Sequence, residues 1–156
     1  MLQVTIPGNQ TLSLEHLVLD YNGTLACDGT LLPGVDQRLL TLSESLQIHV
    51  ITADTFGSVR KELDSLPCEL AIIPQSKQDH AKLDYIETLG PQTVVAVGNG
   101  YNDHLMLTSA VLGMAVMQTE GTATPALLAA DLVIPDILAA LDLLIKPKRL
   151  IATLRN

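Results

Sequence analysis

An aspartate, Asp20, stands at the end of a short apolar run (residues 17–19) and is followed at once by a glycine-containing turn. A carboxylate in this position can attack an electrophile and form a covalent aspartyl intermediate, or it can hold a hard cation through oxygen. Gly23 allows the backbone to turn sharply, and Thr24 offers a hydroxyl and an amide to whatever Asp20 contacts. Asp20 is therefore the first candidate for a catalytic residue.

Three further groups in the chain suit the same chemistry. Thr52 ends a second apolar run, Lys82 lies near the start of a helical pattern, and a glycine-flanked polar loop at residues 98–103 follows another apolar run. In aspartyl phosphate chemistry the carboxylate attacks phosphorus, a hydroxyl and an ammonium neutralise the phosphoryl oxygens, and Mg²⁺ bridges carboxylate and phosphate. These residue types predict phosphoryl transfer if the fold brings them together.

The elements that must position these residues alternate between strands and helices. Short apolar runs predict buried strands, and helical spacing between the runs predicts the helices. The expected strands are residues 17–20, 47–52, 69–73, 93–97, 111–117 and 131–134, and the expected helices are 35–46, 56–66, 78–89, 124–130, 137–145 and 149–154. This pattern is typical of an α/β fold with a three-layer, doubly wound parallel sheet. The carboxyl ends of its strands lie on one side, where the candidate residues can converge.

Local signals predict further details of the elements. Residues 2–6 and 11–14 alternate between apolar and polar types and predict an N-terminal β-hairpin, which either adds an edge to the sheet or covers a subunit contact. Leu40 is expected on the buried side of the first helix. Thr124 is expected as an N-cap, with Pro125 in the first helical position.

Composition limits the classes of partner. The chain is 47% hydrophobic and 17% charged, and its net charge of −8 argues against nucleic acid or an anionic membrane surface as a partner. Cys27 and Cys68 show no metal-ligand spacing. No linker, repeat or long uncharged apolar segment interrupts the sequence, so we expect residues 1–156 to form one domain of a cytoplasmic protein.

The candidate residues also resemble a known family. The segment from Asp20 to Thr24 (D-Y-N-G-T), the segment from Thr52 to Asp54 (T-A-D), Lys82, and residues 98–103 (G-N-G-Y-N-D) resemble the four motifs of the haloacid dehalogenase-like (HAD) superfamily. The closest likeness is to the phosphorylation domain of P-type ATPases, with D-K-T-G-T, T-G-D, K and G-D-G-x-N-D. The motifs keep the order of the family and span about residues 17–134. The resemblance implies a Rossmann-like core, without the nucleotide-binding insertion of the pumps and without a large cap domain.

The resemblance implies a role for each catalytic residue. Asp20 would be the nucleophile that becomes phosphorylated, and the backbone carbonyl of Asn22 would bind Mg²⁺. Thr52 would donate a hydrogen bond to the phosphoryl group. Lys82 would pair with Asp20 and the phosphate, and Lys77 is the rival for this role. Lys82 is favoured because apolar residues on its helix set the face on which it lies.

Further residues of the motifs would complete the site. Asn99 would bind the metal directly, and Asp103 would act at the metal through water or by orienting the loop. The remaining residues expected to contact the substrate are Gly23, Thr24, Ala53 and Asn102.

Two residues depart from the family pattern. Many phosphatases of the superfamily carry an acid where this chain has Asn22, and an amide cannot transfer a proton in that way. Asn99 stands where a metal-binding Asp is usual, so the site loses a negative charge. Asp28, Asp54 or Asp103 are the candidates to compensate, but for Asp54 a cap of the helix that follows Thr55 ranks above a ligand role. We expect slow dephosphorylation as in P-type ATPases, which also lack the acid.

The sequence thus predicts a Mg²⁺-dependent phosphohydrolase or phosphotransferase that acts on a small phosphorylated substrate through Asp20. Its main alternative is a degenerate HAD-like domain that binds a phosphorylated ligand or a protein partner without turnover. A scaffold that assembles through the N-terminal hairpin is a third hypothesis, and a homo-oligomer stays open. Dehalogenation ranks below these, because the 98–103 loop resembles the phosphoryl-transfer branch.

Overall fold

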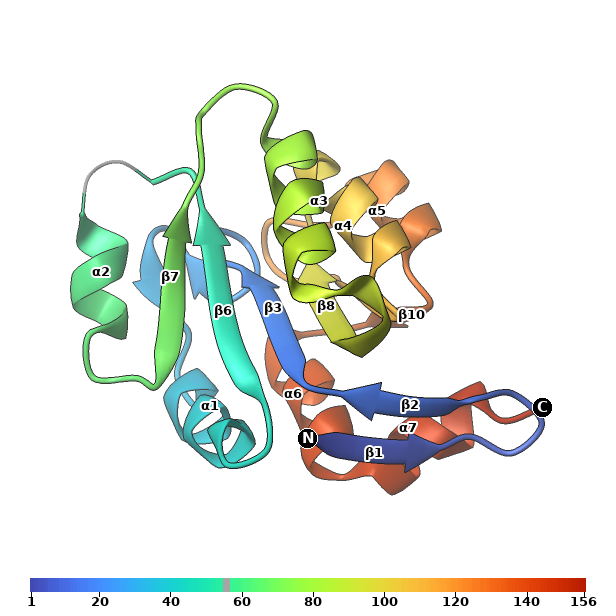
Figure 1. The fold of residues 1–156 in the computed structure, drawn as a ribbon. Helices are drawn as coiled ribbons and strands as arrows, with labels where there is room; N and C mark the ends of the chain where they lie inside the picture. Colours follow the sequence, from blue (N-terminus) through green and yellow to red (C-terminus); the bar gives the residue numbers. More distant parts are fainter. Residues whose placement is uncertain (55–56) are drawn as a thin grey trace.

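The computed structural model describes residues 1–54 and 57–156. Within them, one parallel sheet has six strands in the order β10-β9-β8-β3-β6-β7 (Figure 1). The strands are β3 (His16–Asp20), β6 (Gln47–Thr52), β7 (Cys68–Ile72), β8 (Val94–Gly98), β9 (Leu112–Val116) and β10 (Leu132–Ile134). The predicted doubly wound α/β fold is confirmed.

The strand order reverses at β3. This strand pairs in parallel with β6 on one side and with β8 on the other. The chain builds β3, β6 and β7 outward in one direction, then returns to place β8, β9 and β10 on the opposite side. In open α/β sheets, ligands bind beyond the carboxyl ends of the strands at such a switch point. Asp20 ends β3, so the topology puts it there.

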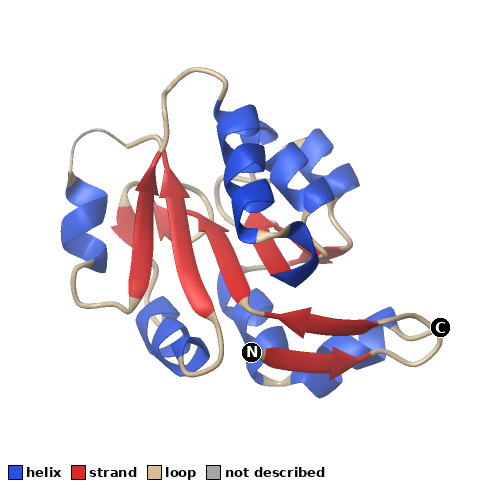
Figure 2. Ribbon diagram, viewed as in Figure 1, coloured by secondary structure: helices blue, strands red, loops and turns tan. Residues whose placement is uncertain are grey.

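Successive residues of the central strand face opposite layers of helices. Leu17 and Leu19 belong to one apolar cluster and Val18 to the other, as expected for the alternation of side chains along a strand. The first cluster includes residues of α1 (Val35–Ser43), α2 (Ser58–Leu63), α6 (Ile137–Ile145) and α7 (Pro147–Leu154). The second includes residues of α3 (Gln78–Leu89), α4 (His104–Ser109) and α5 (Thr124–Ala129). Figure 2 shows the sheet between these helices.

The predicted N-terminal hairpin is present. Strands β1 (Leu2–Thr5) and β2 (Thr11–Leu14) pair antiparallel as a separate sheet. The suggestion that the hairpin extends the main sheet is therefore wrong. Its apolar side chains are buried in the first cluster, which also contains Leu150 of α7, and the Asn156 amide donates to the Pro7 carbonyl at 3.1 Å. The hairpin and the end of the chain therefore pack together (Figure 1). A role of the hairpin in subunit contact stays a prediction.

A second small hairpin lies between β3 and α1. It consists of β4 (Ala26–Cys27) and β5 (Thr30–Leu31), and we call residues 26–31 the flap. The sequence predicts only a turn-rich segment there. The flap and α1 are the elements of regular structure between β3 and β6, all of whose residues are described. Gly29, in the turn of the flap, lines the same cavity as Asp20, so the flap borders that cavity.

Some element boundaries differ from the prediction. Helix α1 ends at Ser43 instead of residue 46, because the Glu44 and Ser45 amides donate to carbonyls three residues earlier, although the Leu46 amide still reaches the Leu42 carbonyl. Leu40, predicted to be buried, is 49% exposed, because Leu39 and Leu42 define the buried face of this short helix.

Four other helices also differ from the prediction. Helix α7 begins at Pro147 instead of residue 149, with the proline in its first turn. Helix α2 begins after Gly57, and the predicted helix start at Phe56 lies, with Thr55, outside the described residues. The N-cap of α5 is Ala123, since Thr124 is already helical. The sequence pattern does not predict α4, because its six residues are too few for a clear period and, unlike α5, it has no proline in its first turn to mark its start. Within the described residues, no helix combines the length and apolar character needed to cross a bilayer.

Candidate active site

A cavity of about 720 Å³ opens beyond the carboxyl ends of β3, β6 and β8. Many of the predicted site residues line it: Asp20, Asn22, Thr52, Ala53, Lys82, Asn99 and Asn102. Gly23, Thr24 and Asp103 are not among the lining residues: Thr24 and Asp103 are buried, and Gly23 lines a neighbouring cavity of about 220 Å³. Residues from distant parts of the chain therefore meet at the switch point of the sheet, where ligands of this kind of fold bind.

Asp20 lines the cavity and has both carboxylate oxygens in contact with neighbours. Its Oδ1 is 2.7 Å from Lys82 Nζ, and its Oδ2 accepts from Thr24 Oγ1 at 3.2 Å. The residue is 8% exposed, because β3 is covered by helices on both faces and only the end of the strand reaches the cavity. The carboxylate is thus fixed in position yet reachable by a ligand.

Lys82, and not Lys77, is the lysine that contacts Asp20. Lys82 is 1% exposed and forms ion pairs of 2.7 Å with Asp20 and 2.6 Å with Asp103. It shares the inward face of α3 with Ile86, one helical turn further on, since residues four apart lie on one face of a helix. Lys77 is exposed and takes the N-cap of α3 with a left-handed backbone.

Asp103 is fully buried and joins the lysine to the loop of residues 98–103. Its Oδ1 contacts Lys82, and its Oδ2 accepts from the backbone amides of Asn99 and Gly100 at 2.9 and 2.8 Å. Gly98 is required beside it, because a Cβ on Gly98 would lie 2.5 Å from Asp103 Cγ. Asp103 therefore orients both the loop and Lys82.

The charges of this cluster perturb one another. Burial, the largest influence, and the Asp103 carboxylate raise the pKa of Asp20 to about 7, against the lowering effect of Lys82. Burial lowers the pKa of Lys82, but Asp20 and Asp103 together outweigh it and the pKa ends above its ordinary value. Lys82 is thus protonated between two carboxylates. A further positive charge near Asp20 would favour its ionised form.

The oxygen atoms around Asp20 fit a hard cation. The Thr24 hydroxyl oxygen lies 3.2 Å from both Asp20 Oδ2 and Asn99 Oδ1. Because the hydroxyl has one proton, it can donate to only one of these two oxygens at a time. Asn99 Nδ2 donates to the Gly121 carbonyl at 3.0 Å, so this amide directs its oxygen toward Asp20 and Thr24. A carboxylate and an amide oxygen are ligands that Mg²⁺ accepts. The residues present therefore suit a divalent cation.

Polar groups from other segments line the rest of the cavity. Thr52 is buried and its hydroxyl accepts from the Asp54 amide at 3.2 Å, an arrangement that lets the hydroxyl donate to a ligand. Asn102 Nδ2 donates to Gln78 Oε1 at 2.5 Å, which turns Asn102 Oδ1 toward Lys82 at 3.5 Å. The sequence interpretation missed Gln78, although it lies one helical turn before Lys82 on the same helix.

The candidates for compensating acids lie in different places. Asp54 lines the cavity, and its carboxylate accepts from Ser58 Oγ at 3.0 Å. The N-cap of α2 is Gly57, so the alternative of Asp54 as the helix cap is wrong. Asp28 is in the flap and is not among the residues that line this cavity, and Asp103 is occupied by its three contacts.

Two residues beyond β9 complete the site and were not predicted. Gln118 Nε2 donates to the carbonyls of Gly23 and Thr24 at 2.9 and 2.8 Å, while its Oε1 accepts from the Ile137 amide at 2.9 Å. Glu120 lines the cavity from the same loop. The available signal was their position just after the expected strand 111–117, because the carboxyl end of every parallel strand faces this side.

Comparisons with known proteins place the geometry in context. No protein-family model matches the chain. The uncharacterized protein MJ0073 of Methanocaldococcus jannaschii is 42% identical over 80 residues, which are 49% of this chain and 86% of the relative. The uncharacterized protein MJ0072 of the same organism is 46% identical over 39 residues, 25% of this chain and 89% of the relative.

Solved structures share the fold at low sequence identity. The 3-deoxy-D-manno-octulosonate 8-phosphate phosphatase of Moraxella catarrhalis, in complex with magnesium, phosphate and KDO, has a TM-score of 0.73 at 14% identity, over 92% of this chain and 94% of its own. The cobalt-bound deoxy-D-mannose-octulosonate 8-phosphate phosphatase of Haemophilus influenzae has a TM-score of 0.72 at 12% identity, with the same coverage. A protein described as a HAD superfamily (subfamily III A) hydrolase, from Legionella pneumophila, has a TM-score of 0.73 at 16% identity, over 88% and 85% of the chains. The fold is thus that of a HAD Rossmann-like core.

Proposed function

Since this chain belongs to the same family as the Methanocaldococcus jannaschii protein MJ0073 and has a HAD-like core, we propose that it is a Mg²⁺-dependent phosphohydrolase or phosphotransferase that works through an aspartyl phosphate at Asp20. The observation that carries this proposal is the contact of Asp20 with Lys82, 2.7 Å long, between two residues that line an open cavity. A buried nucleophile beside a buried cation suits attack on an anionic phosphoryl group.

In the first step, a carboxylate oxygen of Asp20 forms a bond to phosphorus. The bond between phosphorus and the ester oxygen breaks, and its electron pair leaves on the alcohol oxygen, which takes a proton from water. Lys82 and Thr52 face the cavity and offer an ammonium and a hydroxyl to the phosphoryl oxygens. These donors stabilise the charge that those oxygens carry in the transition state.

The metal of this proposal is Mg²⁺. Asp20, Asn99 and the backbone carbonyl of Asn22 would hold it, and it supplies, when bound, a positive charge that offsets the negative charge of the phosphate. Asp103 would act on this site indirectly, since its oxygens already hold Lys82 and the amides of Asn99 and Gly100.

In the second step, water attacks the phosphorus atom of the aspartyl phosphate. The bond from phosphorus to Asp20 breaks, inorganic phosphate leaves, and the carboxylate is regenerated. Asn22 lines the cavity, but its side-chain amide cannot accept a proton from the attacking water or donate one to a leaving group. Because a general acid or base contributes about 10²–10⁴-fold to rate, this step is expected to be slow. The P-type ATPase-like character of the motifs belongs to the same proposal, because a long-lived aspartyl phosphate also allows transfer to another acceptor.

The proposed substrate is a small phosphorylated molecule in the cytoplasm. A cavity of about 720 Å³ falls within the range of small-molecule sites. Its wall carries several amide side chains, including Gln75, Gln78 and Asn102, which suit neutral polar groups on the substrate.

A second candidate function is binding of a phosphorylated ligand or a protein partner without turnover. The specific observation in its favour is that Asn22 and Asn99, both amides, line the cavity at positions where the HAD resemblance leads us to expect acids. In this case Asp20 and Lys82 would still support metal and phosphate binding.

The test is Mg²⁺-dependent hydrolysis of an aryl phosphate by the purified wild-type protein. Asp20→Asn keeps the size of the side chain and removes the nucleophile, so we expect its activity to fall to background. Lys82→Ala should lose most of the activity, whereas the matched control Lys77→Ala removes an exposed lysine and should keep it. Activity that survives in Asp20→Asn refutes the aspartyl mechanism, and no activity in the wild-type protein at high Mg²⁺ favours the binding function.

A further inference from the structure

The proposed cation site is short of negative charge. Lys82 neutralises part of the charge of Asp20, and Asn99 contributes a neutral oxygen. Asp103, the other carboxylate of the cluster, is buried against Lys82 and two backbone amides. A divalent cation binds more tightly as more carboxylates face it. A further acid near Asn99 would therefore raise the affinity of the site for Mg²⁺.

Glu120 is an acid next to Asn99. A Cβ built on Gly23 would lie 2.5 Å from Asn99 Nδ2, 2.7 Å from Glu120 Oε2 and 2.9 Å from Asn99 Oδ1, so the Glu120 carboxylate and the Asn99 amide group adjoin the same point beside the catalytic loop. Glu120 also lines the cavity that contains Asp20. Gly23, with its positive φ of 79°, leaves room for both side chains, and any larger residue there would displace them.

The loop that carries Glu120 is tied to the site on both sides of this residue. Before it, Gln118 Nε2 donates to the carbonyl of Gly23 at 2.9 Å. After it, the Gly121 carbonyl accepts from Asn99 Nδ2 at 3.0 Å, and the Ala123 amide donates to the Asn99 carbonyl at 2.9 Å. Although the Glu120 side chain is exposed, its backbone is therefore held beside the catalytic loop and Asn99.

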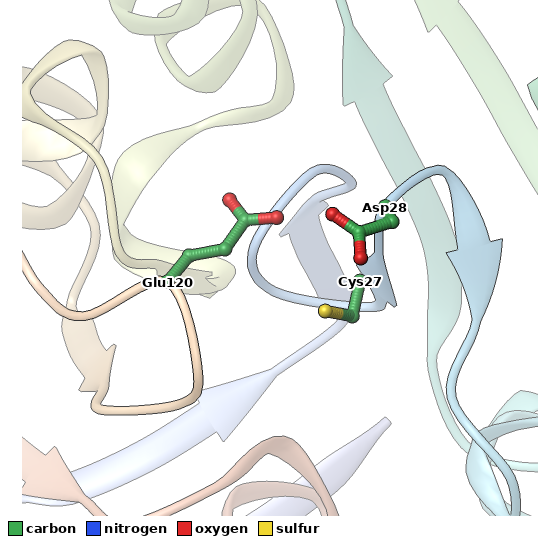
Figure 3. A group of neighbouring side chains, drawn as sticks. All are labelled: Cys27, Asp28 and Glu120. Carbon is green, nitrogen blue, oxygen red and sulfur yellow. The ribbon is translucent and has the colours of Figure 1, made fainter.

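Glu120 also approaches the flap. Figure 3 shows Cys27 and Asp28 on the flap and Glu120 on the facing loop, and the ligating atoms of the three residues lie within 4.8 Å of one another. Cys27 and Glu120 line a neighbouring cavity of about 220 Å³, and neither Cys27 nor Asp28 lines the active-site cavity, so a cation held by this trio would occupy a different position from one held by Asp20 and Asn99. The two locations can be separated by substitution.

We propose that Glu120 supplies to the Mg²⁺ site the negative charge that Asn99 does not provide. The inference rests on the proposed function, since it assigns a new residue to the same site. It accounts for an amide at position 99 beside a carboxylate from another loop, and for a glycine at position 23 between them. Glu120 thereby becomes a determinant of metal affinity that the motifs do not contain.

The test is the dissociation constant of Mg²⁺, measured by calorimetry without substrate. Glu120→Gln should raise this constant by about 10-fold to 100-fold, the range for groups that tune a metal from outside its direct ligands. Asp28→Asn is the matched control, because it removes a neighbouring exposed acid, and Cys27→Ser removes the thiol; both should keep the wild-type constant. Adding Asn99→Asp to Glu120→Gln should restore tight binding, since it returns the lost charge.

The other outcomes distinguish failure of the Glu120 role from failure of the proposed function. If Glu120→Gln binds Mg²⁺ like the wild-type protein while Asp20→Asn binds it weakly, the role of Glu120 is refuted and the proposed function stands. If Asp28→Asn and Cys27→Ser weaken binding as much as Glu120→Gln does, the cation lies at the flap and the inference fails. If the wild-type protein does not bind Mg²⁺, or Asp20→Asn binds it equally well, the proposed function fails as well.

Discussion

Removal of the buried cation is the sharpest test of the site electrostatics. Lys82→Met replaces the ammonium by an apolar chain of similar length, at a position that is 1% exposed. Asp20 and Asp103, which contact Lys82 Nζ at 2.7 and 2.6 Å, are then left without it in a buried setting. Breaking a buried ion pair from one side costs about 3–5 kcal/mol of unfolding free energy. We expect a loss in this range at about pH 8, which is well above the ordinary pKa of a carboxyl group.

The loss should depend on pH in a defined direction. In the wild-type protein the pKa of Asp20 is raised from 3.8 to about 7, first by burial and then by Asp103, while Lys82 lowers it. Without Lys82 the pKa of Asp20 rises further. A carboxylate whose pKa is higher in the folded than in the unfolded state loses its stabilising contribution as pH rises from the unfolded pKa to the folded one. The defect of Lys82→Met should thus be smaller at about pH 5 than at about pH 8.

The assay is urea unfolding of Lys82→Met, Lys77→Met and the wild-type protein at both pH values, without metal. Lys77 is exposed, so its substitution should change the unfolding free energy by no more than about 0.5 kcal/mol. The reasoning is refuted if Lys82→Met is as stable as Lys77→Met at the higher pH, or if its defect grows as the pH falls.

Three further predictions concern the active site and the core. Asn22→Asp combined with Asn99→Asp should raise the turnover of an aryl phosphate by about 10²-fold, because it returns the general acid and the metal-binding carboxylate; an unchanged rate in a steady-state assay would contradict this account. Burial, the main influence, lowers the pKa of His49 from 6.5, so its stabilising contribution is present above about pH 6.5 and is lost as pH falls. His49→Leu should therefore flatten the acid side of the stability profile in urea titrations, and an unaltered profile would argue against a neutral buried imidazole. Gly98→Ala should destabilise the fold by about 1–3 kcal/mol, since its Cβ would meet Asp103 Cγ at 2.5 Å, and a wild-type melting temperature would show that Asp103 moves freely.

Local patterns in the sequence determined the core of the fold. The apolar run before Asp20 ends as β3 ends, and the run before Thr52 ends as β6 ends. Both follow from a physical rule that acts on a few neighbouring residues, since a run of apolar side chains must be buried and a polar residue ends it. The spacing within residues 78–89 likewise predicted α3 with its observed bounds, and with it the helix that carries Lys82.

Other features were not predicted, because their elements are short or because they depend on residues that are distant in the sequence. Helix α4 is short and, unlike the equally short α5, lacks a proline in its first turn, and the exposure of Leu40 depends on how α1 is packed. Gln118 follows an expected strand, but a single glutamine carries no chemistry until its contacts with Gly23 and Thr24 are known. These features depend on neighbours in space, which a window of sequence does not contain.

The sequence by itself therefore determined the strands, most of the helices and the residue types able to act on a phosphoryl group. The tertiary structure alone decided which of them meet. It placed Lys82 between Asp20 and Asp103, left Lys77 outside, and brought Glu120 beside Asn99. The physical reason is the strand order, because the reversal at β3 sets loops that are distant in sequence side by side, and only then do burial and charge act between them.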